Sequence, residues 1–244
     1  MNIAIDIGNS LSKIALFDGG QIIETVRTES LSVAFLEEFF GRCDVKPTKA
    51  VLASVADVPE DVEAFLEANT EQYLRVTFRT KTPIKNLYAT PKTLGIDRLA
   101  AAVAASTIYP GSNILVVDLG TAITIDIVNA AGEFLGGNIT LGASGRFRAL
   151  HEYTAKLPML EKPDEVAAFG NDTTTAIQSG VVTGIVYELE SYIANASARY
   201  EDLKIIFTGG DANYFAKRLK NAIFATGDLV VFGLNTILEY NAKS

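Results

Sequence analysis

Two turns in the sequence carry the same chemical groups, one near the N-terminus and one near the middle. Asp118-Leu119-Gly120-Thr121 joins two short apolar runs, and Asp6-Ile7-Gly8-Asn9 does the same 112 residues earlier. Such a turn places backbone N–H groups and a carboxylate at the end of a buried strand, where a phosphate and its metal ion could bind. The repeat therefore predicts two similar domains with a nucleotide between them.

A third turn, Thr208-Gly209-Gly210, lies between an apolar run at 204–207 and an expected helix at 213–220. Glycines at a strand-to-helix turn let a ligand approach the backbone, although a Gly-Gly turn alone is weak evidence. With Lys13 as a cation, the three turns hold the groups that phosphoryl transfer needs. The sequence contains neither Gly-x-x-x-x-Gly-Lys-Ser/Thr nor Gly-x-Gly-x-x-Gly, which excludes a P-loop and a dinucleotide-binding fingerprint.

An acidic and a basic side chain are neighbours in the sequence, just before an alanine-rich run. Asp97 and Arg98 precede residues 99–105, where five of seven residues are alanine, and a helix is expected over 99–108. Helix capping alone would explain Asp97, because an acid is favoured at a helix N-terminus. Arg98 is unfavourable there by the same argument, which favours a bound anion. The residues by themselves leave capping and catalysis both open for Asp97.

The elements that must position these groups follow an α/β pattern, in which strands alternate with helices. Two meanders are expected, one at 2–7, 11–18 and 21–27, and one made of two strands within 113–128, joined at 118–121, followed by 133–139. Single strands are expected at 50–54, 73–76 and 204–207. Helices are expected at 31–40, with Ser32 as its cap, and at 59–67, 146–156 and 174–200, and segment 228–234 leads into a last helix that ends near 240. Asp172 or Thr173 is expected to cap the helix at 174–200, which carries one apolar face through Ile177, Val181, Ile185, Leu189 and Ile193. Residues 80–94 are expected to form a loop under which Tyr88 packs. The repeat divides the chain into domains 1–111 and 112–244.

The composition restricts the remaining chemistry. The single cysteine, Cys43, excludes an internal disulfide and a cysteine-ligated metal site. The single histidine, His151, argues against a Ser-His-Asp triad. A net charge of −8 without a Lys/Arg cluster argues against non-specific nucleic-acid binding. The apolar runs are too short to span a membrane and the N-terminus lacks a secretion signal, so a cytoplasmic protein is expected.

The duplicated Asp-x-Gly turn with a later Gly-Gly turn resembles the actin, Hsp70 and sugar-kinase superfamily. That resemblance implies an α/β fold of two ribonuclease-H-like domains with ATP bound in the cleft between them. Within the superfamily the chain resembles the type III pantothenate kinases over nearly its full length. The motifs that carry this resemblance are Asp6-x-Gly8-Asn9-Ser10-x-x-Lys13, Gly95-x-Asp97-Arg98, Asp118-x-Gly120-Thr121-Ala122-x-Thr124, Gly136-Gly137, Thr208-Gly209-Gly210 and Asp228-Leu229-Val230 to Leu234.

The resemblance implies an activity with its cofactors and partners. The family transfers the γ-phosphate of ATP to pantothenate, giving 4′-phosphopantothenate, the first step of coenzyme A biosynthesis. It uses Mg²⁺ and a monovalent cation, K⁺ or NH₄⁺. It works as a homodimer, with the pantothenate site near the subunit interface, and with no nucleic-acid or membrane partner.

The resemblance also assigns roles to residues. Asp97 would be the general base, Asp118 would bind the monovalent cation, and Asp6 would hold Mg²⁺ directly or through water. The substrate-binding residues would be Tyr88, Gly95, Ile96, Asp97, Arg98 and Thr173. ATP and its phosphates would contact Asp6, Ile7, Gly8, Asn9, Ser10, Leu11, Ser12, Lys13, Gly120, Thr121, Thr124, Thr208, Gly209 and Gly210. Arg98 could pair with the substrate carboxylate or with the transferring phosphate.

One departure and two alternatives accompany this interpretation. Leu141-Gly142 stands where the family usually has Pro-Gly, which predicts a less constrained loop and leaves its substrate contact open. A superfamily kinase for another small hydroxyl acceptor would have the same phosphate loops, and only Gly95 to Arg98 argues against it. A non-catalytic ATP-binding regulatory protein would use the same scaffold, and the presence of Asp97 and Lys13 argues against it.

Overall fold

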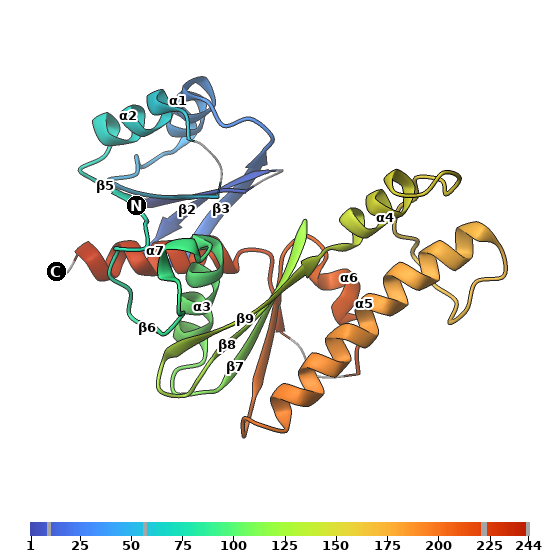
Figure 1. Ribbon diagram of the computed structural model, residues 1–244. Coiled ribbons are helices and arrows are strands. Elements are labelled where there is room, and N and C mark those ends of the chain that lie inside the picture. Colours follow the sequence, from blue (N-terminus) through green and yellow to red (C-terminus); the bar gives the residue numbers. More distant parts are fainter. Residues whose placement is uncertain (9–10, 56–57, 221–223, 243–244) are drawn as a thin grey trace. The chain divides into compact units, whose positions relative to one another are not determined.

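The computed structural model (Figure 1) describes residues 1–8, 11–55, 58–220 and 224–242. Packing divides the chain into two compact units. The first unit comprises Met1–Ser112, Val128–Gly136 and Asp228–Ser244, and the second comprises Asn113–Ile127 and Gly137–Gly227. Helix α7 (Leu229–Ala242), at the end of the chain, thus belongs to the packing unit that contains the N-terminus. The division into domains 1–111 and 112–244 stays a prediction.

The first unit is built on a five-stranded sheet with the order β3-β2-β1-β4-β5. Its strands are β1 (Asn2–Ile7), β2 (Ser12–Asp18), β3 (Gln21–Thr28), β4 (Lys49–Ser54) and β5 (Gln72–Arg75). The first three form the expected antiparallel meander, and β4 and β5 add in parallel. Because both faces of β1 are covered, Ile3, Ala4 and Ile5 are all buried, as expected for a strand at the centre of a two-sided sheet.

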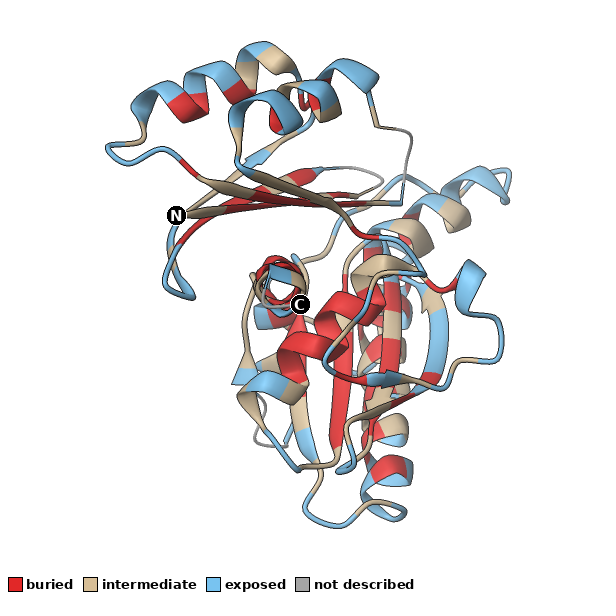
Figure 2. Cartoon of the chain, turned by 90° about the vertical axis from the view of Figure 1, so that its left-hand side faces the viewer, coloured by how far each residue is buried: buried red, intermediate tan, exposed pale blue. Residues whose placement is uncertain are grey.

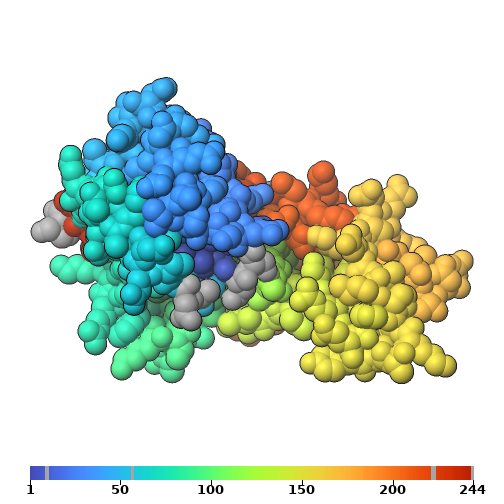
Figure 3. All heavy atoms as spheres, turned by 90° about the horizontal axis from the view of Figure 1, so that it is seen from above, coloured from blue at the N-terminus to red at the C-terminus, as the bar shows by residue number. Residues whose placement is uncertain are grey.

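Helices cover both faces of this sheet. In Figures 1 and 2, α1 (Val33–Arg42) and α2 (Glu60–Asn69) lie on one face and α7 lies on the other, where it contacts β1 and β4. Figure 3 shows the outer surface of α1 and α2 in blue to cyan. Ser32 caps α1 by accepting the backbone N–H of Phe35 at 3.3 Å, which confirms the predicted helix start. Leu36, Phe39 and Phe40 then face the core.

Helix α3 (Ile96–Ile108) packs against α7 within the same unit. The two helices approach so closely that a side chain at Gly233 would overlap the backbone of Ala100. Residues 99–105 are therefore buried, and small alanine side chains suit this contact. The preceding segment contains β6 (Lys85–Asn86) and a short 3-10 helix (Pro91–Thr93), both within the segment expected to be a loop.

A second sheet has the strand order β11-β10-β7-β8-β9-β6. Its longer strands are β7 (Ile114–Leu119), β8 (Ala122–Val128), β9 (Glu133–Leu141) and β10 (Lys204–Thr208), and β11 (Phe224–Ala225) is short. In the second unit, β7, β8 and β10 contribute to one apolar core with α4 (Ala143–Glu152), α5 (Thr173–Ser197) and α6 (Ala212–Ala216). The buried residues Ile177, Val181, Ile185, Leu189 and Ile193 of α5 confirm the predicted apolar face.

Asp172 caps α5 with a two-way hydrogen-bond pattern. Its carboxylate accepts the backbone N–H of Thr175, whose hydroxyl in turn accepts the N–H of Asp172. The cap falls on Asp172 rather than on Thr173, the other candidate, and Thr173 becomes the first residue of the helix.

Some boundaries differ from the predictions. Helix α4 ends at Glu152, four residues before the predicted end at 156, and α6 ends at Ala216 rather than near 220. Helix α3 begins at Ile96 because Gly95 takes the capping position, so Asp97 and Arg98 lie in its first turn. Within the described part of the chain, no helix combines the length and the apolar character needed to cross a membrane.

Candidate active site

The first Asp-x-Gly turn, at which phosphate binding is predicted, lies between β1 and β2 in the first unit. The backbone N–H of Gly8 donates to the carbonyl of Leu11 at 3.1 Å and closes the turn. Strand pairing places Asp6 opposite Lys13 and Ile7 opposite Ser12. Asp6, Ile7, Gly8, Leu11, Ser12 and Lys13 are thereby brought together, whereas Asn9 and Ser10 lie outside the described residues.

Lys13, on β2 just after this turn, pairs with a carboxylate from the end of the chain. Its side chain is 18% exposed and its ammonium nitrogen Nζ lies 3.5 Å from Asp228 Oδ1, at the residue before α7. Burial is the main cause that lowers the pKa of Lys13, and Asp228 and Asp6 oppose that shift. A cation is therefore fixed beside the turn, as the phosphate-binding prediction requires.

The second phosphate turn and the Gly-Gly turn meet at one edge of the second unit. Strands β7 and β10 are parallel neighbours with Asp118 opposite Thr208, so both turns leave the same ends of adjacent strands. A side chain at Gly209 would come within 2.5 Å of Asp118 Oδ1 and of the Leu119 carbonyl, and this glycine has a φ of +91°. The two turns lie close together because the carboxyl ends of parallel neighbours share one edge of a sheet.

Thr121 and Thr124 complete the set of predicted residues on this hairpin. Thr121 lies in the exposed turn and Thr124 is half-buried on β8. The backbone N–H of Gly120 donates to the carbonyl of Ala122 at 3.0 Å and keeps the turn tight. Backbone groups of the turn are thus ordered beside the Asp118 carboxylate.

Asp97 and Arg98 lie at the N-terminus of α3. Asp97 Oδ1 accepts the backbone N–H of Arg98 at 2.8 Å, and a side chain at Gly95 would overlap this same oxygen. Gly95, not Asp97, occupies the capping position, and it makes no side-chain cap. Asp97 nevertheless lies in the first turn, where the helix dipole favours an acid, so its position agrees with helix stabilisation and leaves the catalytic role open.

Arg98 is buried and lies against two aromatic rings. Its guanidinium carbon Cζ is 5.4 Å from the ring centroid of Tyr88 and 5.9 Å from that of Phe134. Tyr88 and Arg98, two of the residues expected at the substrate site, are therefore in contact within the first unit. Phe134 was not identified from the sequence, and no signal distinguishes it there from other apolar residues of a strand.

Thr173 lies in the second unit, at the exposed start of α5. It lines a pocket of about 810 Å³ between α4 and α5, together with Leu141, Arg146, Ala149, Leu150, Tyr153, Thr154, Leu157, Ala176, Ile177, Gly180 and Val181. Thr173 and Asp97 belong to different units, and their meeting in one site stays a prediction.

Gly142 at the start of α4 is tied to the second phosphate turn. Its backbone N–H donates to the carbonyl of Thr121 at 3.0 Å, and a side chain here would overlap the carbonyl of Gly120. Because Leu141-Gly142 stands where the family usually has Pro-Gly, a less constrained loop was predicted here. The structure shows that the glycine is fixed to the turn, while Leu141 is exposed.

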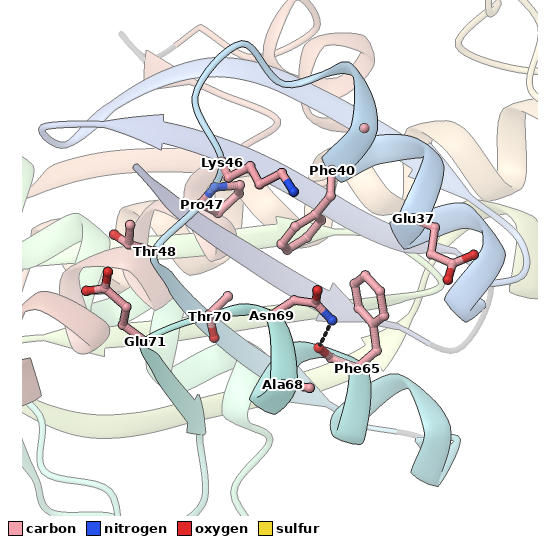
Figure 4. Close-up of a pocket in the computed structure, with 11 residues that line it drawn as sticks. Glu37, Phe40, Lys46, Pro47, Thr48, Phe65, Ala68, Asn69, Thr70 and Glu71 are labelled. Atoms are coloured by element: carbon pink, nitrogen blue, oxygen red, sulfur yellow. Dashed lines mark hydrogen bonds between the residues drawn. The ribbon is translucent and has the colours of Figure 1, made fainter.

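Another pocket, of about 760 Å³, opens between the ends of α1 and α2 (Figure 4). Phe40 and Phe65 meet edge to face there, with ring centroids 5.4 Å apart, and Lys46, Asn69 and Glu71 lie around them. The Asn69 side chain donates to the carbonyl of Phe65 at 2.9 Å. None of the predicted site residues lines this pocket.

Comparison with known proteins decides the family. The model of the type III pantothenate kinase family matches residues 2–195. A type III pantothenate kinase of Phocaeicola vulgatus is 42% identical over 243 residues, which cover 100% of both chains. The chain belongs to the type III pantothenate kinase family.

Solved structures confirm the fold class expected for this family. A Campylobacter jejuni protein assigned to the Baf family of transcriptional activators is 24% identical, covers 99% of this chain and 100% of its own, and gives a TM-score of 0.66. A polyphosphate/ATP-glucomannokinase from Arthrobacter is 15% identical, covers 99% and 98% of the two chains, and gives 0.51. At these identities the two likenesses concern the fold alone. They agree with a kinase fold of two ribonuclease-H-like domains.

The two acidic turns offer oxygen donors of the kind that a hard cation needs. Among the described residues, no group of three or more His, Cys, Asp or Glu side chains is placed to hold a metal ion. Asp118 instead lies beside backbone groups of Leu119 and Gly209, and Asp6 stands opposite Lys13. Carboxylate and carbonyl oxygens are the ligands that hard cations prefer, and such sites are commonly completed by phosphate and water oxygens.

Proposed function

We propose that this type III pantothenate kinase phosphorylates pantothenate with ATP, with Asp97 as the general base. Family membership supports ATP-dependent phosphorylation of pantothenate in coenzyme A biosynthesis. The observation that carries the role of Asp97 is its place in the first turn of α3, beside Arg98 and Tyr88. Its Oδ1 is engaged by the backbone, and Oδ2 is the oxygen proposed to face the acceptor hydroxyl.

In the proposed reaction, the hydroxyl oxygen of pantothenate forms a bond to the γ-phosphorus as the bond from that phosphorus to the β,γ-bridging oxygen breaks. Asp97 accepts the hydroxyl proton late, so its contribution is mainly its position. Arg98 is positioned to neutralise a carboxylate or a phosphate. Bound Mg²⁺ would neutralise charge on the ATP phosphates, with Asp6 as its ligand, directly or through water.

The remaining predicted residues take these roles in the proposal. Asp6 to Lys13 form the first phosphate loop, Gly120, Thr121 and Thr124 the second, and Thr208 to Gly210 the turn near adenosine. Asp118 binds K⁺ or NH₄⁺, and Thr173 contributes to the pantothenate site. These assignments are supported by the grouping of the residues within each unit.

We also propose a homodimer in the cytoplasm, without nucleic-acid or membrane partners. The net charge of −8 supports the absence of nucleic acid. Large apolar side chains on the second unit support a protein contact, because Tyr153 is 87% and Phe169 90% exposed. Tyr153 and Thr173 line the same pocket, which would place pantothenate near the subunit contact.

The test is ADP release by the purified protein with ATP, Mg²⁺ and pantothenate, in K⁺ and in Na⁺. Asp97→Asn keeps the shape of the side chain but removes the base. We expect K⁺-stimulated, pantothenate-dependent turnover that falls by about 10²- to 10⁴-fold in the variant, with ATP binding kept. ATP binding without pantothenate turnover in the wild type would instead favour another acceptor or a regulatory protein.

A further inference from the structure

Strand β9 presents two buried residues on one face beneath the proposed substrate residues. Phe134 is 0% exposed and Gly136, two positions further along, is also buried. Residues two apart on a strand point to the same side of the sheet. Phe134 lies against Tyr88, with ring centroids 6.1 Å apart and a tilt of 48°, and Arg98 Cζ lies 5.9 Å from its centroid.

The backbone fixes Tyr88 to this strand. Strand β6 pairs with β9 so that Asn86 stands opposite Phe134, and the N–H of Leu87 donates to the carbonyl of Phe134 at 2.9 Å. The N–H of Tyr88 donates to the side-chain oxygen of Asn86 at 2.9 Å. The segment that carries Tyr88 is therefore aligned to β9 by its own backbone.

Gly136 leaves the space that the Tyr88 ring occupies. A Cβ atom at Gly136 would lie 3.0 and 3.2 Å from two carbons of that ring, which is tighter than ordinary contact. The residue also has a φ of +98°, a conformation that favours glycine. A side chain at this position would push Tyr88 away from Arg98.

We propose that Phe134 and Gly136 are positioning residues of the pantothenate site. Phe134 holds the guanidinium of Arg98 and the ring of Tyr88 in one arrangement, and Gly136 lets the Tyr88 ring settle over the strand. Cation–π and aromatic contacts of this kind orient buried groups. The inference deepens the proposed function and rests on it, because Tyr88 and Arg98 are its substrate residues.

Steady-state kinetics of Phe134→Leu test the first residue. We expect the KM for pantothenate to rise about tenfold, with the KM for ATP within about twofold of the wild type, since the Phe134 ring orients only the acceptor site. The matched control is Phe39→Leu. Phe39 is 1% exposed and its ring centroid lies 4.9 Å from Arg42 Cζ, so this variant removes a similar buried ring from α1. The control should lower thermal stability without changing the KM for pantothenate.

A double variant distinguishes positioning from general packing. If Phe134 acts through Arg98, Phe134→Leu should add little to the rise in pantothenate KM caused by Arg98→Lys. Fully multiplicative effects would contradict this coupling and overturn the role of Phe134.

Gly136→Ala gives an independent test should the leucine variant fold poorly. It should also raise the KM for pantothenate, whereas Gly132→Ala should not. Gly132 has a φ of +71°, and a Cβ added there would meet no atom within 4 Å, so it shares the backbone strain without the contact to Tyr88.

The outcomes separate the two levels of the proposal. Wild-type turnover of pantothenate with unchanged KM values in Phe134→Leu and Gly136→Ala would overturn the positioning role alone. Absence of pantothenate turnover in the wild type would overturn the proposed function and this inference with it.

Discussion

Lys13 on β2 and Asp228, the residue before α7, form an ion pair with Nζ and Oδ1 3.5 Å apart. Within the sheet, Lys13 stands between Asp6 on β1 and Arg27 on β3. The pKa of Lys13 is lowered mainly by burial, and Arg27 lowers it further. Asp228 and Asp6 act in the opposite direction. Asp228 belongs to a family motif for which the sequence indicated no role, and the structure gives it this one.

Loss of this pair should weaken ATP binding. Lys13→Met removes the cation and should abolish measurable ATP affinity in calorimetric titration with a non-hydrolysable ATP analogue. Asp228→Asn should raise the dissociation constant roughly two- to fivefold, because a partly exposed ion pair contributes no more than about 1 kcal/mol. Glu239→Gln is the control, since it breaks the 2.8 Å pair with Lys49 that also joins α7 to the sheet. Equal effects of the two carboxylate variants would show that Asp228 acts only on stability.

The sequence predicted most of the fold because its signals are local. Alternation and apolar runs identified the two meanders, and Ser32 and Asp172 marked helix starts that the structure confirms. The two-residue strands β6 and β11 were missed, because segments this short carry no periodicity. The packing of α7 with the N-terminal sheet was also missed, since contacts between distant segments leave no local pattern.

The candidate site was predictable where it depends on motifs. Motifs singled out Asp118 and Gly209 separately, and the parallel strands β7 and β10 bring the two turns together. The supporting contacts of Phe134 with Arg98 and of Gly142 with Gly120 were not predictable, because each depends on how three-dimensional packing joins separate elements. Sequence motifs name the residues that meet ligands more readily than those that hold them in place.

Gly142→Ala should damage the second phosphate turn. The added methyl group would overlap the carbonyl of Gly120, so the turn must move, at a cost of about 1–3 kcal/mol for such overpacking. We expect a lower Tm and a higher KM for ATP, measured by thermal denaturation and steady-state kinetics. Gly184→Ala is the control, because nothing lies within 4 Å of its Cβ position in α5, and it should raise the Tm slightly. An unchanged KM for ATP in Gly142→Ala would contradict the role of this contact.

Tyr153→Lys should weaken the proposed dimer. A large, 87% exposed tyrosine beside an apolar pocket is the kind of side chain that dominates a protein contact. Light scattering over a concentration series should show the dimer dissociation constant rising about tenfold or more. Tyr187→Lys, which replaces a 62% exposed tyrosine that does not line the pocket, should leave it unchanged. Monomeric wild-type protein would refute the dimer itself.

Tyr73→Phe should be neutral or stabilising. The buried hydroxyl of Tyr73 on β5 has no hydrogen-bond partner among the described residues, so removing it relieves a desolvated polar group. Burial raises the pKa of Tyr73 from 10.0 to about 12, with a smaller contribution from Glu67. The folded state therefore holds this proton more tightly than the unfolded state does. The stability that comes from this difference in pKa is fully present below pH 10 and is lost as the pH rises towards 12.

Urea denaturation at pH 8 and between pH 10 and 12 tests this expectation. The phenylalanine variant should match or exceed the wild type at pH 8, and its stability should fall less steeply above pH 10. Tyr214→Phe is the matched control, because the hydroxyl of Tyr214 donates to the carbonyl of Pro163 at 2.6 Å and its loss should destabilise the protein. A loss of stability in Tyr73→Phe as large as that in Tyr214→Phe would mean that the Tyr73 hydroxyl has a partner in solution.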